Sequence, residues 1–358
     1  MATERSTALP VIRGRGVGWD PPNRFERLSV DREGWLDPDD PPPETLLLED
    51  ATRSILAYND SPDVGFDVGI NPYRGCEHAC AYCYARPTHE YLGFSAGLDF
   101  ETRIMVKRRA PELLAEALSA KSWKPRSIAL SGNTDCYQPV ERRLRITRQC
   151  LEVLAEFRNP VGVITKSYLV ARDVDLLSEL AGHGAAAVVL SVTTLRPELQ
   201  RVLEPRASTP ARRLGAIRVL ADAGIPVGVN VAPVIPGLTD HEIPSILEAA
   251  ADAGASFAGM ILLRLPHGVK DIFEGWLDQH APERKDKVLN RIRELRGGAL
   301  YDSRFGVRGR GEGPWAEHLQ GVFRLHRRRL GLDRSPELSA DAFRVPSARS
   351  GPQIDLFA

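Results

Sequence analysis

The sequence predicts an α/β fold, a partial (βα)6 barrel that resembles a TIM barrel with two of its eight units missing. Short β-rich runs recur along the middle of the chain, and segments with helical periodicity separate them. The runs lie at Val64–Ile70, Ser127–Ser131, Val161–Thr165, Ala187–Val192, Val227–Ala232 and Phe257–Leu263. Strands that alternate with helices indicate parallel βα units, whose right-handed crossovers curl the sheet. Because six units are too few to close an eight-stranded barrel, we expect it to be open on one side.

The segments between the strands have helical periodicity and recognisable ends. They lie at Pro111–Ala120, Arg142–Phe157, Asp173–Ala181, Pro210–Ala223 and Glu242–Ala253. Thr209 followed by Pro210 is typical of a helix start, and Gly224 is typical of a helix end. The spacing of Thr239 and Glu242 matches a capping box, in which the two side chains bond the first amides of a helix.

The two ends of the chain lack this alternation. Three consecutive prolines at 41–43 favour an extended polyproline conformation before the first strand. We therefore predict an extended arm over 1–48, the barrel over 49–270, a helical extension over 271–329 and a flexible tail over 330–358.

Three cysteines, Cys76, Cys80 and Cys83, follow the first predicted strand with the spacing C-x3-C-x2-C. Three thiolates can hold three corners of a cubane iron–sulfur cluster and leave one iron without a protein ligand. A catalytic zinc site keeps one position open for its substrate in the same way. Reactive residues of such barrels lie at the carboxyl ends of the strands, which is where these cysteines fall. The spacing therefore predicts a catalytic 4Fe–4S cluster.

Two other uses of these cysteines are open at this stage. A zinc site would need a fourth ligand, which His78 or His89 could supply, and the chain would then be a non-catalytic binding module. A disulfide framework has little to build on, because only Cys136 and Cys150 remain and no secretory signal is present.

The bulk composition excludes some classes of function. The 358 residues contain 47 Lys and Arg and 47 Asp and Glu, so the formal net charge is zero and no global attraction to nucleic acid follows. No apolar run approaches the roughly 20 residues that a membrane-spanning helix needs. We expect a cytoplasmic protein without a membrane partner, in a reducing compartment that preserves free thiols.

Four segments together resemble radical S-adenosylmethionine (SAM) enzymes related to spore photoproduct lyase. They are 71–86, with the aromatic Tyr82 just before the last cysteine, 134–141, 164–167 and 233–240, and the resemblance spans about residues 50–325. It implies a 4Fe–4S cluster whose open iron binds the amino and carboxylate groups of SAM. It further implies reduction by an electron-donor protein, cleavage to a 5′-deoxyadenosyl radical, and hydrogen abstraction from a substrate.

The resemblance places SAM at the carboxyl ends of successive strands. The residues implied in binding it are Tyr82, Ser131, Gly132, Asn133, Lys166, Ser167, Ser191 and Asn230. The Ser131–Asn133 segment would contact the amino group, and an ammonium beside a hydroxyl at Lys166 and Ser167 suits a carboxylate. The alternative is that serines at strand ends cap turns.

Cys136 follows the second strand, so we expect it to face the barrel mouth. Spore photoproduct lyase returns a hydrogen to its product radical from a cysteine, and the resemblance makes Cys136, with Tyr137 as its partner, a candidate for that catalytic role. The alternative is a small buried residue. Cys150 lies among apolar residues of a predicted helix and is expected in the core.

Three basic clusters and the end of the tail bear on partners. The clusters are 142–145, 304–310 and 324–329, and each could contact DNA phosphates or form a solvated surface. The expected substrate is a DNA lesion or a nucleotide, and a peptide or small metabolite is the alternative. The segment Gln353–Phe357 resembles peptides that dock bacterial repair proteins on the replication sliding clamp.

Overall fold

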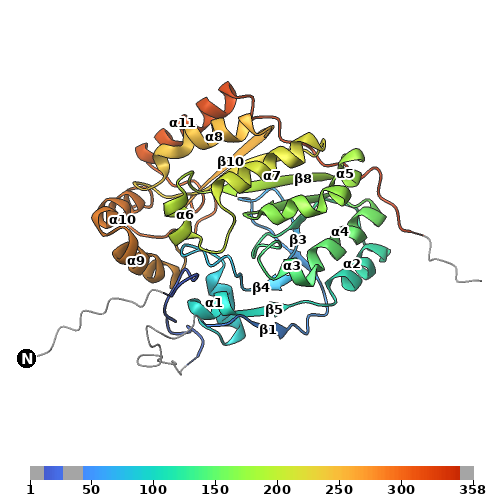
Figure 1. The fold of residues 1–358 in the computed structure, drawn as a ribbon, viewed down its shortest axis with the longest axis horizontal. Coiled ribbons are helices and arrows are strands. Elements are labelled where there is room, and N and C mark those ends of the chain that lie inside the picture. The colour runs from blue at the N-terminus through green and yellow to red at the C-terminus, as the bar shows by residue number, and fades with distance from the viewer. Residues whose placement is uncertain (1–11, 27–42, 347–358) are drawn as a thin grey trace, which may run out of the picture.

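A computed structural model describes residues 12–26 and 43–346, and its centre is a curved seven-stranded sheet (Figure 1). The strand order is β10-β9-β8-β7-β6-β3-β2, and every pair from β10 to β3 is parallel. The strands are β2 (Leu56–Tyr58), β3 (Val68–Ile70), β6 (Ile128–Leu130), β7 (Val161–Thr165), β8 (Ala186–Val192), β9 (Val227–Val234) and β10 (Phe257–Leu262). Strand β2 adds antiparallel to β3. The partial barrel of six parallel strands is confirmed, with β2 and β10 as the edge strands of the sheet.

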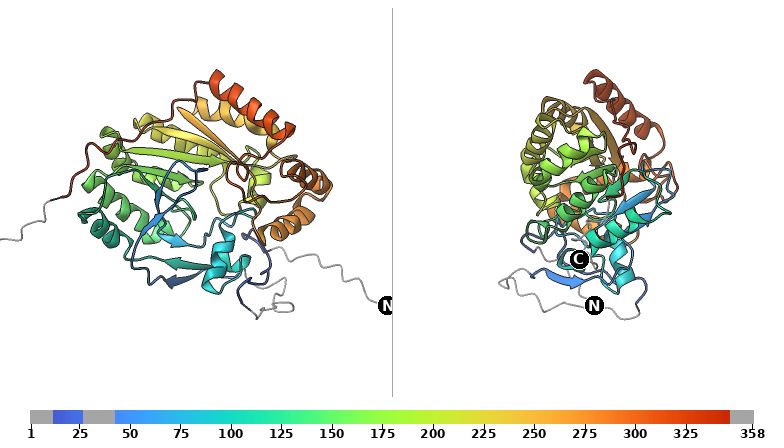
Figure 2. Two further views of the ribbon diagram at one scale, coloured as in Figure 1. Left: turned by 180° about the vertical axis from the view of Figure 1, so that it is seen from behind. Right: turned by 90° about the vertical axis from the view of Figure 1, so that its right-hand side faces the viewer.

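Helices cover the outer face of this sheet (Figures 1 and 2). They are α2 (Ala110–Ser119), α4 (Ile146–Phe157), α5 (Val174–Gly182), α7 (Pro210–Asp222) and α8 (Ile243–Asp252). Val163, Leu190 and Val229 of the central strands are fully buried. Burying each such side chain stabilises the fold by about 1.5–3 kcal/mol. The apolar β-rich runs of the sequence therefore become the central strands of the sheet.

One predicted helix and one predicted strand have different limits. The segment 142–157 is two helices, α3 (Glu141–Leu144) and α4, separated by Arg145 with a φ of 54°. The carboxylate of Glu141 accepts hydrogen bonds from Thr147 N at 3.0 Å and Arg148 N at 3.4 Å, so it caps α4. Strand β3 begins at Val68, because residues 59–67 form a loop closed by a 2.8 Å bond between Asn59 N and Asp67 O.

The predicted side-chain caps do not form. Thr209 precedes α7 but makes no capping hydrogen bond. The Thr239 hydroxyl accepts from Ile235 N at 2.9 Å, and Glu242 accepts from Thr194 and from Leu195 N. The capping-box prediction is therefore wrong, because both side chains hold the loops that follow β8 and β9.

The predicted N-terminal arm is in fact partly folded. Strand β1 (Leu46–Glu49) pairs with β5 (Arg103–Val106), which also pairs with β4 (Tyr73–Arg74), and these form a second, three-stranded sheet. Residues 12–26 pack on the body, with Val17 buried beside Ala96 and Ile272.

The C-terminal extension contains α9 (Val269–His280), α10 (Lys285–Glu294) and α11 (Pro314–Arg329). Residues 330–346 of the predicted flexible tail pack against the rest of the chain. Leu332 O accepts from Ala258 N at 2.9 Å, and the rings of Phe343 and Phe157 pack together. The predicted clamp peptide Gln353–Phe357 lies outside the described residues.

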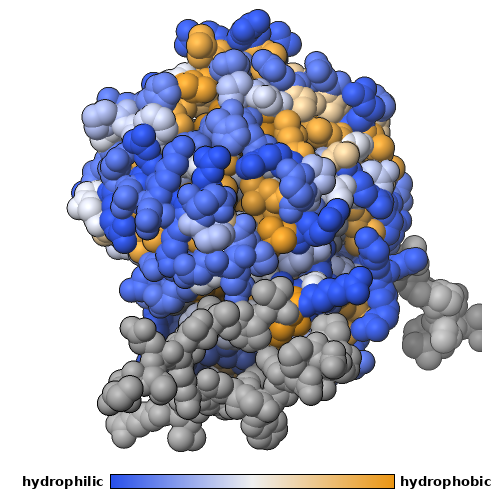
Figure 3. Space-filling view, turned by 60° about the vertical axis from the view of Figure 1, so that its left-hand side comes forward, coloured by the Kyte–Doolittle hydropathy of each residue, from blue (hydrophilic) through white to orange (hydrophobic). Residues whose placement is uncertain are grey.

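The surface is mixed in character. Figure 3 shows a face dominated by hydrophilic residues with separate apolar patches between them. None of the described helices combines the length and hydrophobicity that crossing a membrane requires.

Candidate functional site

The three predicted cluster ligands share one loop, residues 75–85, which we call the cysteine loop. Cys76, Cys80 and Cys83 carry free thiols, and Cys76 and Cys80 are only 7% and 8% exposed. The backbone is tightly turned, with Ala79 at a φ of 59° and Cys76 N bonded to Phe100 O at 2.9 Å. The three cysteines thus share one short, tightly turned loop.

The three thiols influence one another electrostatically. Burial raises the pKa of each of them, and for Cys76 the nearby Asp135 and the other two cysteines raise it further. Three buried thiols with raised pKa values become thiolates only when a positive group enters among them. This donor set fits a metal cluster.

The two histidines considered as fourth ligands of a zinc ion each have one ring nitrogen in a polar contact. His78 Nδ1 lies 3.3 Å from Asp135 Oδ2, and His89 Nε2 lies 2.9 Å from Arg103 O. A cubane cluster needs no fourth side chain, because it binds each of three thiolates to a different iron.

A buried ion pair fixes the cysteine loop on its outer side. The guanidinium of Arg86 donates to Cys80 O at 3.0 Å and to Gly97 O at 2.8 Å, and it pairs with Glu101. Glu101, in α1 (Leu98–Thr102), also accepts from Gly16 N at 3.0 Å. Arg86 therefore joins the loop to α1 and to the N-terminal segment.

Gly16 lies directly against this loop. A β-carbon placed on Gly16 would lie 1.8 Å from Ala79 O, which no side chain could tolerate. Residue 16 is thus a glycine because the two backbones are in contact. The N-terminal segment that was predicted as an arm forms part of the wall of the site.

A second buried network surrounds Lys166. Its ammonium lies 3.3 Å from Glu204 Oε1 and donates to Ala232 O at 2.8 Å. Glu204 also pairs with Arg213 and accepts from the Tyr82 hydroxyl. Burial alone would raise the pKa of Glu204, but Arg213 and then Lys166 lower it below its usual range, so the carboxylate is ionised.

Two of the predicted SAM contacts lie in or beside this network. Lys166, which was expected to present its ammonium to a carboxylate, lies beside Glu204, whose single negative charge also faces Arg213. Ser167 caps the short helix Tyr168–Asp173, because its hydroxyl accepts from Leu169 N at 3.3 Å. Tyr82 lies beside Cys80 with its hydroxyl committed to Glu204, so its ring covers the loop.

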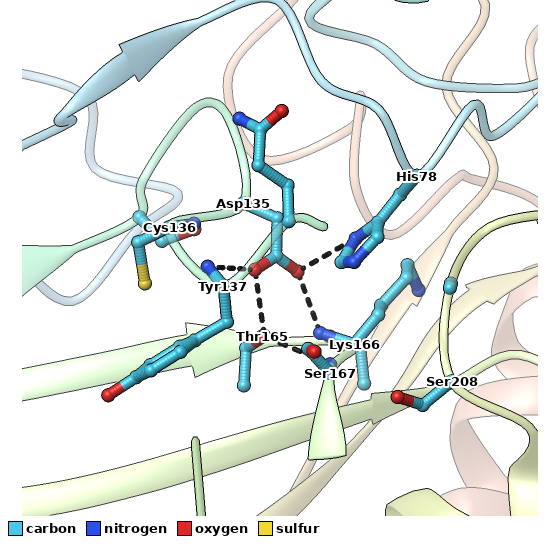
Figure 4. A network of polar contacts seen from close by, with 12 residues as sticks. His78, Asp135, Cys136, Tyr137, Thr165, Lys166, Ser167 and Ser208 are labelled. Atoms are coloured by element: carbon cyan, nitrogen blue, oxygen red, sulfur yellow. Dashed lines mark hydrogen bonds and ion pairs between the residues drawn. The ribbon is translucent and has the colours of Figure 1, made fainter. Parts of the chain in front are cut away.

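Asp135 organises the carboxyl ends of β6 and β7, as Figure 4 shows. Its carboxylate accepts from Thr165 Oγ1 and Lys166 N, both at 2.8 Å, and from Tyr137 N at 2.9 Å, and it pairs with His78. Burial would raise its pKa, but His78 and these hydrogen bonds lower it. Asp135 was not singled out from the sequence, although it lies inside the 134–141 motif.

The remaining predicted SAM residues lie after β6 and on β8 and β9. Ser131 has a φ of 80° and donates to Thr134 O at 2.6 Å, and Gly132 O accepts from the Tyr84 hydroxyl at 2.8 Å. Asn133 is exposed, and its backbone N–H donates to Asn71 Oδ1 at 3.0 Å. Ser191 near the end of β8 and Asn230 in the middle of β9 are register partners in the sheet. Their contacts with SAM stay a prediction.

Cys136 does not open to the barrel mouth. Its side chain is fully buried in the main hydrophobic core, and Figure 4 shows it pointing away from the Asp135 carboxylate. The Tyr137 hydroxyl donates to Asp173 at 3.1 Å and is equally buried. This location favours the structural alternative for both residues over a hydrogen-donor role. Cys150 is buried in the same core, as predicted.

His89 makes the packing around the loop sensitive to pH. Burial lowers its pKa to about 4. An unfolded histidine has a pKa near 6.5. The folded state therefore loses stability as the pH falls from about 6.5 to 4, by roughly 3 kcal/mol in total. Urea denaturation of wild-type apoprotein at several pH values should show this loss, whereas His89→Gln should show a flatter dependence. Identical slopes in the two proteins would contradict the assignment.

Two cavities border the cysteine loop. The larger has a volume of about 630 Å³, and its lining includes Glu77, which directly follows Cys76. The smaller has a volume of about 180 Å³ and is lined in part by His78 and Ser167. Arginines contribute to both: Arg13, Arg15, Arg143 and Arg206 to the larger cavity, and Arg142, Arg206 and Arg212 to the smaller.

Comparison with known sequences agrees with this site. The sequence pattern of the Radical SAM superfamily matches residues 70–250, which include the cysteine loop and strands β6 to β9. An uncharacterised protein of Mycobacterium tuberculosis is 38% identical over 244 residues, which cover 67% of this chain and 71% of that protein. An uncharacterised protein of Methanocaldococcus jannaschii is 28% identical over 222 residues, which cover 62% of this chain and 79% of that protein.

Solved structures show where the fold recurs. Spore photoproduct lyase complexed with dinucleoside spore photoproduct is similar with a TM-score of 0.57 and 17% identity, over 79% of both chains. A cysteine-to-serine mutant of the same enzyme gives a TM-score of 0.56 and 19% identity over the same shares. With the superfamily pattern spanning half of the sequence, the chain belongs to the radical SAM superfamily and is an enzyme that uses a 4Fe–4S cluster and SAM.

Proposed function

We propose that this radical SAM enzyme acts on a nucleic-acid lesion or a nucleotide, from which the 5′-deoxyadenosyl radical supplied by SAM abstracts hydrogen. The observation that carries the proposal is the smaller cavity, where Arg142, Arg206 and Arg212 converge beside His78 of the cysteine loop. Guanidinium groups are well suited to phosphate because they donate two parallel hydrogen bonds. A phosphate held here would lie next to the loop that binds the cluster.

The three basic clusters differ in the charge that they leave available. Arg142 and Arg143 are exposed on α3 and form no ion pair with a described residue. In the second cluster, Arg304 pairs with Asp302 and Glu312, and Arg308 pairs with Asp63. The arginines of the third cluster also form no ion pair with a described residue, but none of them lines either cavity. The first cluster therefore favours phosphate contact most strongly, since its charge is not balanced and it borders both cavities.

The fold likeness gives further support. The spore photoproduct lyase structure holds a dinucleoside lesion. Its likeness extends over 79% of this chain, which is more than the region that the superfamily pattern covers. A lesion has to leave the base stack to reach a radical inside a barrel, and damaged bases unstack at the lowest cost.

The proposal is tested by SAM cleavage in the presence of candidate substrates. The anaerobically reconstituted enzyme, reduced with dithionite, is given ultraviolet-irradiated oligonucleotides, unirradiated ones, or a peptide mixture, and 5′-deoxyadenosine is quantified. We expect the irradiated oligonucleotides to raise its release most, and deuterium from a labelled lesion to appear in it. Stimulation by peptides alone would overturn the proposal in favour of a peptide substrate.

DNA binding has its own expected signature. Phosphate contacts make affinity fall steeply with salt. Arg142→Gln should weaken binding of all sequences alike and reduce the salt slope by about one. Arg109→Gln, an exposed arginine beside α2 and outside the three clusters, serves as the matched control and should leave both quantities unchanged. An unaltered salt slope in Arg142→Gln would argue against phosphate contact at this cavity.

A further inference from the structure

The larger cavity has a built lining that the proposed reaction does not use. Residues 13–15 and 43–47 form one side, and Glu77, the 139–143 segment and Arg206 form the other. Its volume of about 630 Å³ is sufficient for a bound small molecule. Four arginines and two glutamates line it, so its charge is positive.

The arginines differ in how their charges are satisfied. Arg15 donates to Glu101 O at 3.0 Å and Thr45 Oγ1 at 3.3 Å, and Arg206 pairs with Glu77 Oε1 at 3.0 Å. Burial and then the nearby Arg206 lower the pKa of Arg15, so positive charge is crowded here. No ion pair joins Arg13 or Arg143 to any residue within 12–26 and 43–346. An anion in the cavity would relieve this crowding.

Glu77 lines the same cavity and has an unpaired hydrogen-bond acceptor. Its side chain is buried, with the residue only 4% exposed. Oε1 accepts from Thr45 Oγ1 at 2.9 Å and pairs with Arg206, whereas Oε2 is buried without a hydrogen-bond partner among the described residues. A buried acceptor left unpaired is costly, typically about 1–3 kcal/mol. A ligand that carries a hydrogen-bond donor would satisfy it.

We propose that this cavity binds one nucleotide, with its phosphate on Arg13 and Arg143 and an amino-bearing base on the free carboxylate oxygen of Glu77. Carboxylates accept from the amino group of cytosine, while thymine presents a carbonyl at that position. A nucleotide carries both a phosphate for the unpaired arginines and a hydrogen-bond donor for the unpaired oxygen of Glu77. The inference rests on the proposed function for its substrate class and adds a second site that distinguishes bases.

The test is calorimetric binding of dCMP and dTMP to the reconstituted enzyme without SAM. We expect dCMP to bind more tightly, by about 5- to 150-fold. Glu77→Gln should remove this preference, because an amide can donate to a carbonyl and accept from an amine. Arg143→Gln should weaken both nucleotides equally. Arg109→Gln, an exposed arginine beside α2, is the control and should change neither affinity.

Two results would overturn the inference. One is equal binding, or no binding, of the two nucleotides by the wild-type enzyme. The other is an unchanged preference in Glu77→Gln that retains its iron and its circular dichroism spectrum. Arg143→Gln is exposed on α3 and keeps the inference testable if Glu77→Gln loses its cluster. If either result occurs while irradiated DNA still stimulates SAM cleavage, the nucleotide site is excluded and the proposed function stands.

Discussion

Replacing Cys76, Cys80 or Cys83 with alanine is expected to abolish SAM cleavage and to reduce the bound iron from about four per chain to a trace. Each thiolate holds one corner of the cluster, and an alanine offers no metal ligand in its place. Iron and sulfide analysis, together with 5′-deoxyadenosine release after anaerobic reconstitution, measures both effects. Any one variant that keeps a full cluster and normal cleavage would remove its cysteine from the ligand set.

Cys150→Ala is the matched control for these variants. Cys150 is also a buried free thiol, but it lies in α4 within the main core. Its truncation should lower the free energy of unfolding while leaving the iron content unchanged. The comparison separates loss of a ligand from loss of a buried sulfur.

Glu204→Gln is expected to destabilise the fold by about 3–5 kcal/mol, because it leaves the buried guanidinium of Arg213 without its counter-charge. Lys166 and Arg213 both pair with this carboxylate, and Arg213 is fully buried. Denaturation in urea measures the difference. Glu198→Gln, on the exposed side of α6 (Pro197–Leu203), should change stability by less than about 0.5 kcal/mol.

The effect of Glu204 should depend on pH with a defined sign. Because its two cations lower its pKa in the folded protein, its contribution is present above the usual carboxyl pKa of about 4.3 and is lost as the pH falls. The stability gap between wild type and Glu204→Gln should therefore narrow under acid conditions. If this difference in unfolding free energy is constant down to low pH, or is absent at neutral pH, Glu204 is not an ionised member of the buried network.

The fold was predictable where burial imposes a repeating pattern. The strands at 161–165 and 227–234 are close to their predicted limits, because central parallel strands are apolar on both faces. The break at Arg145 was not predictable, since it depends on the Glu141 carboxylate folding back to bond two later amides. The three-stranded sheet was not predicted for a similar reason. Strands β1, β4 and β5 are short, and their backbone groups pair with partners that are distant in the sequence.

The residues of the site also differ in how far the sequence predicts them. The cysteines follow a local spacing, so the sequence indicates them directly. Arg86, Glu101 and Glu204 have no local signature, since each is an ordinary charged residue until folding brings its partner to it. For Lys166, the position directly after a strand was predicted correctly, but its pairing with Glu204 was not predicted.

Because Gly16 contacts Ala79, the cysteine loop depends on the N-terminal segment for part of its packing. A shortened chain beginning at the first barrel strand would keep every cysteine and still lack the backbone that shields the outside of the turn. Arg86 would retain Glu101, but Glu101 would lose the amide that Gly16 donates. The N-terminal segment is therefore expected to be necessary for a stably folded cysteine loop.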